Sequence, residues 1–156
     1  MNTRALLIAI MAFSFLTKLL GGSRDQSSSA HDLSTPEGAV LSLEDAYRAN
    51  DIEKAVRCKD FRGEAEQILH DKSADVRTED IIAETARVLE MGYRTEIKAS
   101  GFPNMKGVTS TFTEKRALSS DRVVLTEVFR LPDGSTHTEK VHVRRTKNGW
   151  RVISAP

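Results

Sequence analysis

The most constraining feature of this sequence is a change in the spacing of its apolar residues near residue 92. Between about residues 35 and 92 they recur every three or four positions, as on one face of an α-helix. Beyond residue 92 they tend to alternate with polar residues, as in a half-buried strand. Helices followed by strands are typical of an α+β protein. We therefore expect three N-terminal helices packed on a curved antiparallel sheet.

The expected helices have recognisable ends. Thr35 followed by Pro36 and Glu37 provides an N-cap, a proline in the first turn and a favourable acid. Asp51 can cap the next helix, and helical spacing continues over residues 62–70. The segment Thr78-Glu79-Asp80 opens the last helix, and Gly92 lies where a left-handed C-terminal cap is expected.

Five segments have the pattern of strands: residues 93–99, 108–118, 122–131, 136–146 and 149–154. The last four are separated by turn-forming residues at 119–121, 132–134 and 147–149. Short turns between consecutive strands predict an antiparallel meander. Covered by helices on one side, such a sheet is expected to curl into an open cone.

The N-terminus predicts export. Arg4 precedes the 12 mainly apolar residues 5–16, which fit a secretory signal and are short for a membrane span of about 20 residues. Cleavage is expected after Gly22 or Ala30, or residues 5–20 remain as a membrane anchor. We assign residues 1–22 to a signal peptide or anchor, 23–34 to a flexible linker and 35–156 to the folded domain. The expected location is periplasmic or anchored in the inner membrane.

Charge is unevenly distributed along the 156 residues, although the formal net charge is only +1. Residues 31–92 carry 15 acids and 8 bases, a net charge of −7, whereas residues 93–156 carry 12 bases and 6 acids, a net charge of +6. Either the two layers complement each other, or one surface steers a charged protein partner. The sequence has no basic stretch with interleaved aromatic residues, so we expect no nucleic-acid partner.

The sequence lacks the common catalytic and metal-binding motifs, and we expect a protein that is not an enzyme and has no cofactor or metal. The single cysteine, Cys58, excludes an internal disulfide and lies on an apolar helical face, which predicts a core position. His137 and His142 lie five residues apart on one expected strand, hence on opposite faces.

One acidic residue conflicts with the strand pattern. Glu127 is in phase with apolar Leu125 and Phe129, so strict alternation directs its carboxylate inward. With His137 and Glu139 of the next strand, it could line a pocket capable of acid–base chemistry. The interpretation that we favour is structural: a bulge turns Glu127 outward, or arginine or backbone donors satisfy it.

Several segments together resemble a known family. Residues 35–47 and 50–56 resemble the first two helices of nuclear transport factor 2-like (NTF2-like) domains. Ala55 to Phe61, with Glu64-Ala65, is similar to bacterial immunity proteins of that fold. So are Gly101-Phe102-Pro103, Leu131 to Gly134 and Asn148 to Val152, and the resemblance covers about residues 35–154.

The resemblance implies a cone-shaped protein that binds and neutralises a cognate toxin protein by occlusion. Export would suit a toxin that acts in the periplasm. One alternative is a small-molecule-binding protein, or an isomerase- or dehydratase-type enzyme, that uses the pocket of Glu127, His137 and Glu139. Another is an accessory subunit of an envelope assembly, anchored by residues 5–20.

Overall fold

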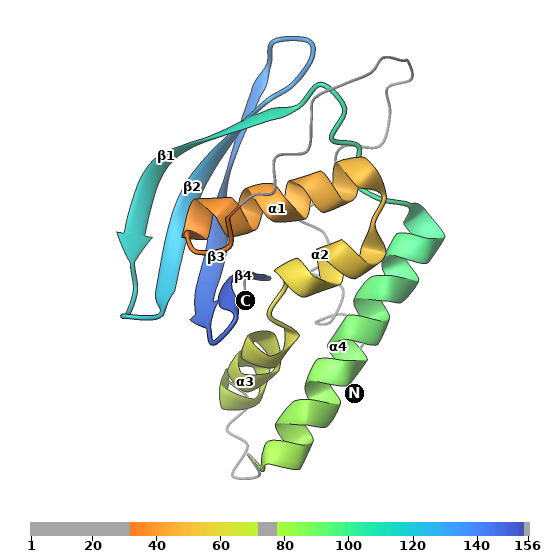
Figure 1. Ribbon diagram of the computed structural model, residues 1–156, viewed down its shortest axis with the longest axis vertical. Helices are drawn as coiled ribbons and strands as arrows, with labels where there is room; N and C mark the ends of the chain where they lie inside the picture. The colour runs from red at the N-terminus through yellow and green to blue at the C-terminus, as the bar shows by residue number, and fades with distance from the viewer. Residues whose placement is uncertain (1–31, 72–77, 155–156) are drawn as a thin grey trace.

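The computed structural model describes residues 32–71 and 78–154. The elements, in chain order, are α1 (Pro36–Ala49), α2 (Ile52–Cys58), α3 (Phe61–Asp71), α4 (Glu79–Ser100), β1 (Thr109–Ala117), β2 (Arg122–Arg130), β3 (Thr136–Thr146) and β4 (Gly149–Ile153) (Figure 1). The expected α+β class is confirmed. The predicted signal peptide or anchor (residues 1–22) and both predicted cleavage sites lie outside the described residues. Among the described residues, no helix is long and apolar enough to cross a membrane.

The three predicted helix caps are present as hydrogen bonds. The side chains of Thr35, Asp51 and Thr78 accept from backbone N–H groups three residues ahead, at 3.0, 2.9 and 3.4 Å. The described helical layer contains four helices rather than three. Lys59 has extended backbone dihedrals, and the Asp60 N–H donates to the carbonyl of Val152 on β4 at 2.9 Å. The chain thereby leaves the helical path and separates α2 from α3.

The strand expected at residues 93–99 is wrong, because α4 continues to Ser100. Residues four positions apart stabilise this extension as a helix: Arg94 pairs with Glu90 at 2.8 Å, and the Thr95 hydroxyl donates to the Met91 carbonyl at 2.8 Å. Gly92 therefore lies inside α4. The helix ends at Gly101, whose φ of +82° suits a residue without a Cβ.

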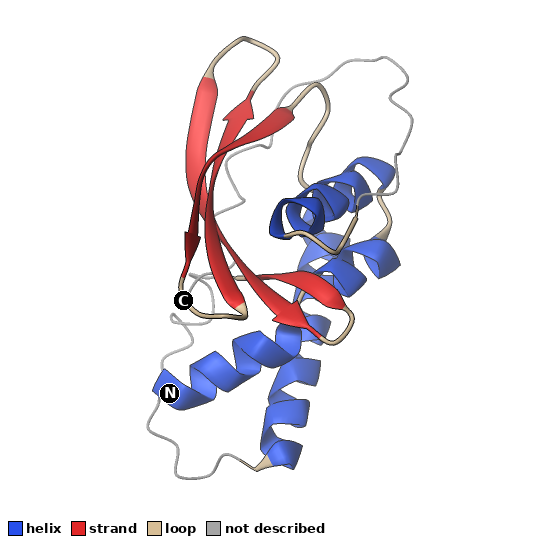
Figure 2. Ribbon diagram, turned by 60° about the vertical axis from the view of Figure 1, so that its left-hand side comes forward, coloured by secondary structure: helices blue, strands red, loops and turns tan. Residues whose placement is uncertain are grey.

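The four strands form one antiparallel meander in the order β1-β2-β3-β4. The sheet bends sharply, with α1 inside the bend and α3 on the other side (Figure 2). We call the side facing α1 the inner face; it carries Val123, Leu125, Glu127 and Phe129 of β2. The alternate residues, including Arg122 and Val124, lie on the outer face.

The hydrophobic core lies between α1, α2 and the inner face of the sheet. Its least exposed members include Ala39 and Ala46 of α1, Ala55 of α2 and Leu125 of β2, each 0% exposed. Trp150 packs against this cluster, as does Leu33, which the sequence places in the linker. The Trp150 N–H donates to the Leu33 carbonyl at 2.8 Å. The folded unit therefore includes residues just before 35.

Candidate functional site

A small cavity opens on the inner face of the sheet, beneath α1. Its volume is about 140 Å³, smaller than the roughly 300–1,000 Å³ typical of drug-sized ligand sites and close to the ~150 Å³ cavity that holds benzene in an engineered core. The apolar part of its lining comes from Val40 and Leu43 of α1, Val141 of β3 and Val152 and Ile153 of β4. The cavity can therefore take one small head group.

Three carboxyl groups line this cavity: Glu44 from α1, Glu127 from β2 and Glu139 from β3. Glu127 and Glu139 are directly paired neighbours on adjacent strands, which places their side chains on the same face. Glu44 and Glu127 are 2% and 1% exposed, and Glu139 is half-buried. Buried acids at this density are costly unless they are paired or protonated.

Glu127 points inward, as strict alternation predicts. A bulge does occur in β1 directly opposite, between Phe112 and Glu114, but it does not turn Glu127 outward. Burial, followed by hydrogen bonding to Glu44, raises the pKa of Glu127 to about 9. Glu127 is therefore neutral at pH 7, and its Oε1 atom is buried without a hydrogen-bond partner.

Glu44 has the neutralising partners that Glu127 lacks. Its Oε2 accepts a hydrogen bond from the Arg48 guanidinium one helical turn along α1, at 2.9 Å, and its Oε1 accepts from the Ser110 hydroxyl of β1. Arg48 also donates to the Val108 carbonyl at 3.2 Å. Arg48 thus balances the charge of Glu44, whereas Glu127 is neutral because it is protonated.

The structure separates the expected trio of Glu127, His137 and Glu139. His137 has an exposed side chain, stacks on Phe129 with ring centroids 6.4 Å apart and does not line the cavity. Its Nε2 lies 3.9 Å from a Glu139 carboxylate oxygen. Burial is the main reason why the pKa of Glu139 is raised. Glu127 and Glu139 share the cavity, and His137 is not part of its lining.

Lys59 is a buried cation in the cavity lining. Its ammonium group lies 3.1 Å from a Glu64 carboxylate oxygen, donates to the Ser154 hydroxyl at 2.7 Å, and sits over the rings of Phe61 and Tyr93. Lys59 is therefore already neutralised by Glu64. Among the described residues, Arg48 is the only lysine or arginine that forms an ion pair with any of the three cavity acids.

Glu44 is the residue of this site that the sequence analysis missed. Its position carried a signal, because it lies four residues after Val40 and three before Tyr47, on the apolar stripe of α1. An acid on such a stripe faces the core, as Glu127 does on its strand. Two in-phase acids on facing elements would have predicted a buried carboxyl pair.

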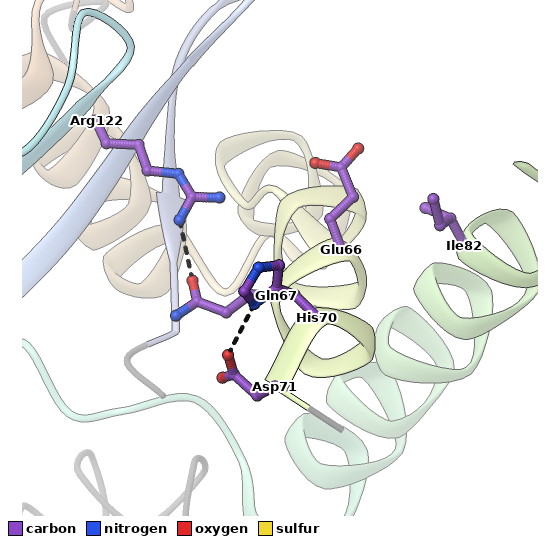
Figure 3. A pocket seen from close by; sticks show the side chains of 6 residues that line it. All are labelled: Glu66, Gln67, His70, Asp71, Ile82 and Arg122. Carbon is purple, nitrogen blue, oxygen red and sulfur yellow. Dashed lines mark hydrogen bonds and ion pairs between the residues drawn. The ribbon is translucent and has the colours of Figure 1, made fainter. Parts of the chain in front are cut away.

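A larger hollow of about 540 Å³ lies between α3, the start of α4 and the start of β2 (Figure 3). Its polar side chains contact one another: Arg122 donates to the Gln67 amide oxygen at 3.2 Å, and His70 lies 3.4 Å from Asp71. The side chains of His70 and Asp71 are 70% and 58% exposed. The hollow presents solvated groups without a converging set of buried ones.

Basic side chains gather on the outer face of the sheet. Arg116, Arg130 and Lys140 are exposed there, and none of the three forms an ion pair within 4 Å among the described residues. His142 also lies on this face. Burial lowers the pKa of His142, and the charges of Arg116, Arg122 and Lys140 lower it further. We call Arg116, Arg122, Lys140 and His142 the basic patch. Glu114 is an acid on this face.

Cys58 and the histidines behave as the sequence predicts. Cys58 is 2% exposed in the core, and burial raises the pKa of its thiol, which disfavours the nucleophilic thiolate. His137 and His142 face opposite sides of β3 by their strand register. Among residues 32–71 and 78–154, no three His, Cys, Asp or Glu side chains are arranged to hold a metal ion.

Comparison with known proteins gives weak structural similarities. No protein-family model and no curated protein sequence matches the chain. A protein named as an NTF2-like transpeptidase from Campylobacter jejuni is 12% identical, with a TM-score of 0.40 over 77% of this chain and 98% of its own. An NTF-2 like protein of unknown function from Shewanella oneidensis is 14% identical, with a TM-score of 0.39 over 74% and 89%.

A ketosteroid isomerase-like protein from Erwinia carotovora atroseptica is 12% identical, with a TM-score of 0.35 over 77% of this chain and 89% of its own. Identities and scores this low support no statement about activity. The fold class rests on the helices, strand order and register described above.

Proposed function

We propose that this chain is an NTF2-like immunity protein, which binds a cognate toxin protein and neutralises it by occlusion rather than by catalysis. The observation that carries the proposal is the pair of exposed cations in the basic patch, Arg116 and Lys140, on the outer face of the sheet. Exposed charges of one sign on a rigid surface accelerate association with a partner of opposite charge. We therefore propose that the toxin presents an acidic surface to this patch.

Intramolecular pairing accounts for only part of the charge difference between the two layers. Lys115 of β1 pairs with Glu37 of α1 at 3.2 Å, and Arg144 of β3 pairs with Glu66 of α3 at 2.7 Å. These contacts join the acidic helices to the basic sheet. Arg116 and Lys140 are exposed and have no ion pair within 4 Å among the described residues, so their charges remain available to a partner.

The direct test is rescue from toxicity. Each toxin encoded next to this gene is expressed in the periplasm of a host bacterium, with or without the full chain, and growth is measured. We expect one toxin to be neutralised. The double reversal Arg116→Glu and Lys140→Glu should weaken rescue, whereas Arg87→Glu, an exposed arginine of α4, should not.

Two results would count against this function. Failure of the chain to neutralise or bind any neighbouring toxin would remove the immunity role. Salt-dependent binding to nucleic acid, lost in the same double reversal, would reassign the basic patch to a different class of partner.

We also propose that the protein acts outside the cytoplasm, on the basis of the apolar residues 5–16 that follow Arg4. A toxin that attacks the cell wall or membrane lipid from the periplasm would meet an exported immunity protein there. Residues 5–20 would provide the membrane contact if the leader stays uncleaved.

The cavity beneath α1 favours a second candidate function, the binding or conversion of a small molecule. The specific observation is Glu127, a buried neutral acid with one unpartnered oxygen. A protonated carboxyl can donate to a ligand or act as a general acid. Turnover would require a second group at the reacting atom, and exposed His137 lies outside the cavity lining.

A further inference from the structure

We propose that the cavity beneath α1 binds the head group of a small organic cation, a guanidinium or a primary ammonium, between the carboxyl groups of Glu127 and Glu139. This proposal rests on the second candidate function and names its ligand class. Two residues of the basic patch, Lys140 and His142, also line this cavity, so the two proposals are tested separately through Glu127, which lies outside the patch.

The first support is the convergence of acids on a small volume. Glu44, Glu127 and Glu139 come from three different elements and line one cavity of about 140 Å³. Only Glu44 has a bonded cation, Arg48 at 2.9 Å. Glu127 and Glu139 stand side by side on adjacent strands, as a planar head group with several N–H donors requires.

The second support is the unused hydrogen-bonding capacity of Glu127. Its Oε1 is buried and has no hydrogen-bond partner among residues 32–71 and 78–154, although buried polar atoms in folded proteins are almost always hydrogen-bonded. This oxygen is therefore available to accept a hydrogen bond from a ligand. A guanidinium or ammonium N–H supplies the missing donor.

The third support is an apolar wall in the cavity lining. Val40 and Leu43 of α1 and Val141, Val152 and Ile153 of the sheet form this wall, and Lys59, Lys140 and His142 are also part of the lining. Such a wall suits the alkyl stem of an amine or guanidine, and its low polarity strengthens an ion pair at the far end. A simple inorganic ion would leave this wall uncovered.

Proton release is the signature of this binding mode. The neutral Glu127 carboxyl must lose its proton to the solvent as the cation arrives, so affinity should rise as pH increases toward about 9. Glu44 of α1, Ser110 of β1 and Glu139 of β3 act on the pKa of Glu127. The other titratable groups in the cavity lining are Tyr47, Lys59, Lys140 and His142. Glu139 is next to exposed His137, which affects the pKa of Glu139 rather than contacting the cavity.

The experiment compares two probes of nearly identical shape with the full chain. n-Butylguanidinium stays charged throughout the pH range because guanidinium groups have a pKa above about 12, whereas n-butylurea is neutral. Titration calorimetry at pH 6, 7 and 8, in buffers of different ionisation enthalpy, gives the affinity and the protons released. We expect millimolar or tighter binding of n-butylguanidinium only, strengthening by up to tenfold per pH unit with release of about one proton.

A matched pair of variants locates the binding. Glu127→Gln keeps the shape of the side chain but cannot ionise, so it should weaken n-butylguanidinium binding at least tenfold at pH 8 and abolish proton release. Glu114→Gln, which removes an exposed acid on the outer face, should bind like the wild type.

Three outcomes would overturn the proposal. Absence of n-butylguanidinium binding to the wild type would do so without any variant. Equal binding of n-butylurea would contradict the cation preference while leaving a ligand cavity in place. Unchanged binding and proton release in a folded Glu127→Gln protein would place the cation elsewhere. Toxin rescue by Glu127→Gln distinguishes all three from failure of the immunity role.

Discussion

The carboxyl group of Glu127 on β2 faces that of Glu44 on α1 in the interior of the protein, and the two acids are 1% and 2% exposed. Glu44 is bonded to Arg48 and Ser110, whereas Glu127 carries its own proton. This relationship couples the stability of the fold to pH, because ionising Glu127 would place a second negative charge beside the first.

Replacing Glu127 by Gln should change how stability depends on pH. The pKa of Glu127 is about 9 in the folded protein and near 4.5 in the unfolded chain, so the unfolded chain binds fewer protons between these values. Stability of the wild type should therefore fall as pH rises from about 5 to 9, by at most about 1.4 kcal/mol per pH unit from this group. The Glu127→Gln protein should lack this slope.

Urea unfolding at pH 5, 7 and 9 measures the difference between the two proteins. Glu114→Gln, on the exposed outer face, is the control and should follow the wild type. Parallel stability profiles for wild type and Glu127→Gln would show that Glu127 is not held neutral by the fold.

Leu125 should be the most sensitive aliphatic position of the sheet. It is 0% exposed at the centre of the inner face, so Leu125→Ala removes packing and leaves a void, at a cost of about 2–5 kcal/mol in unfolding free energy. Leu118→Ala alters the same residue type at 49% exposure and should cost less than about 0.5 kcal/mol. Urea unfolding measures both values. Equal losses of unfolding free energy for Leu125→Ala and Leu118→Ala would contradict the placement of Leu125 in the core.

The turn between β3 and β4 should not tolerate a side chain at Gly149. This glycine has a φ of +99°, and a Cβ there would lie 2.7 Å from the Leu33 carbonyl oxygen. Gly149→Ala should therefore cost more than Gly101→Ala, which has a φ of +82° but nothing within 4 Å. Thermal unfolding of the two variants measures the effect of the close approach of Leu33. A smaller decrease in Tm for Gly149→Ala than for Gly101→Ala would contradict that close approach.

Much of the fold follows from local sequence signals. The caps at Thr35, Asp51 and Thr78 and the turn residues between the last four strands placed most element boundaries within a residue or two. Residues 93–99 were misassigned because Tyr93, Thr95 and Ile97 alternate with polar residues, while Tyr93 and Ile97 also lie one helical turn apart. In the helix, Tyr93 contacts Tyr47 and Phe61, which are distant in sequence, and such tertiary contacts override local propensity.

The candidate site was half visible in the sequence. Alternation placed Glu127 on the inner face and beside Glu139, but it could not show that a helix acid faces the same space. His137 shares their face by register, but it is the second residue of β3, where its ring is exposed. The basic patch was harder to predict from the sequence, because strand pairing is what brings Arg116 of β1 close to His142 and Lys140 of β3.

Expression of the full chain in a bacterial host should test export separately from function. We expect a periplasmic or membrane-associated protein, and a soluble form shortened by 22 or 30 residues if the leader is cleaved at either predicted site. Intact-mass measurement of the fractionated protein gives the new N-terminus. Full-length protein confined to the cytoplasm would contradict export.

The association rate constant kon of the chain with its cognate toxin tests the central claim most directly. Stopped-flow mixing of the purified pair at low and high salt should show a kon that falls with ionic strength, and a reduction of about tenfold or more at low salt for the Arg116→Glu, Lys140→Glu double variant. Arg87→Glu should leave kon within about twofold of the wild type. A toxin that binds the wild type and the double variant at the same rate, regardless of salt, would contradict the assignment of the basic patch as the toxin-binding surface.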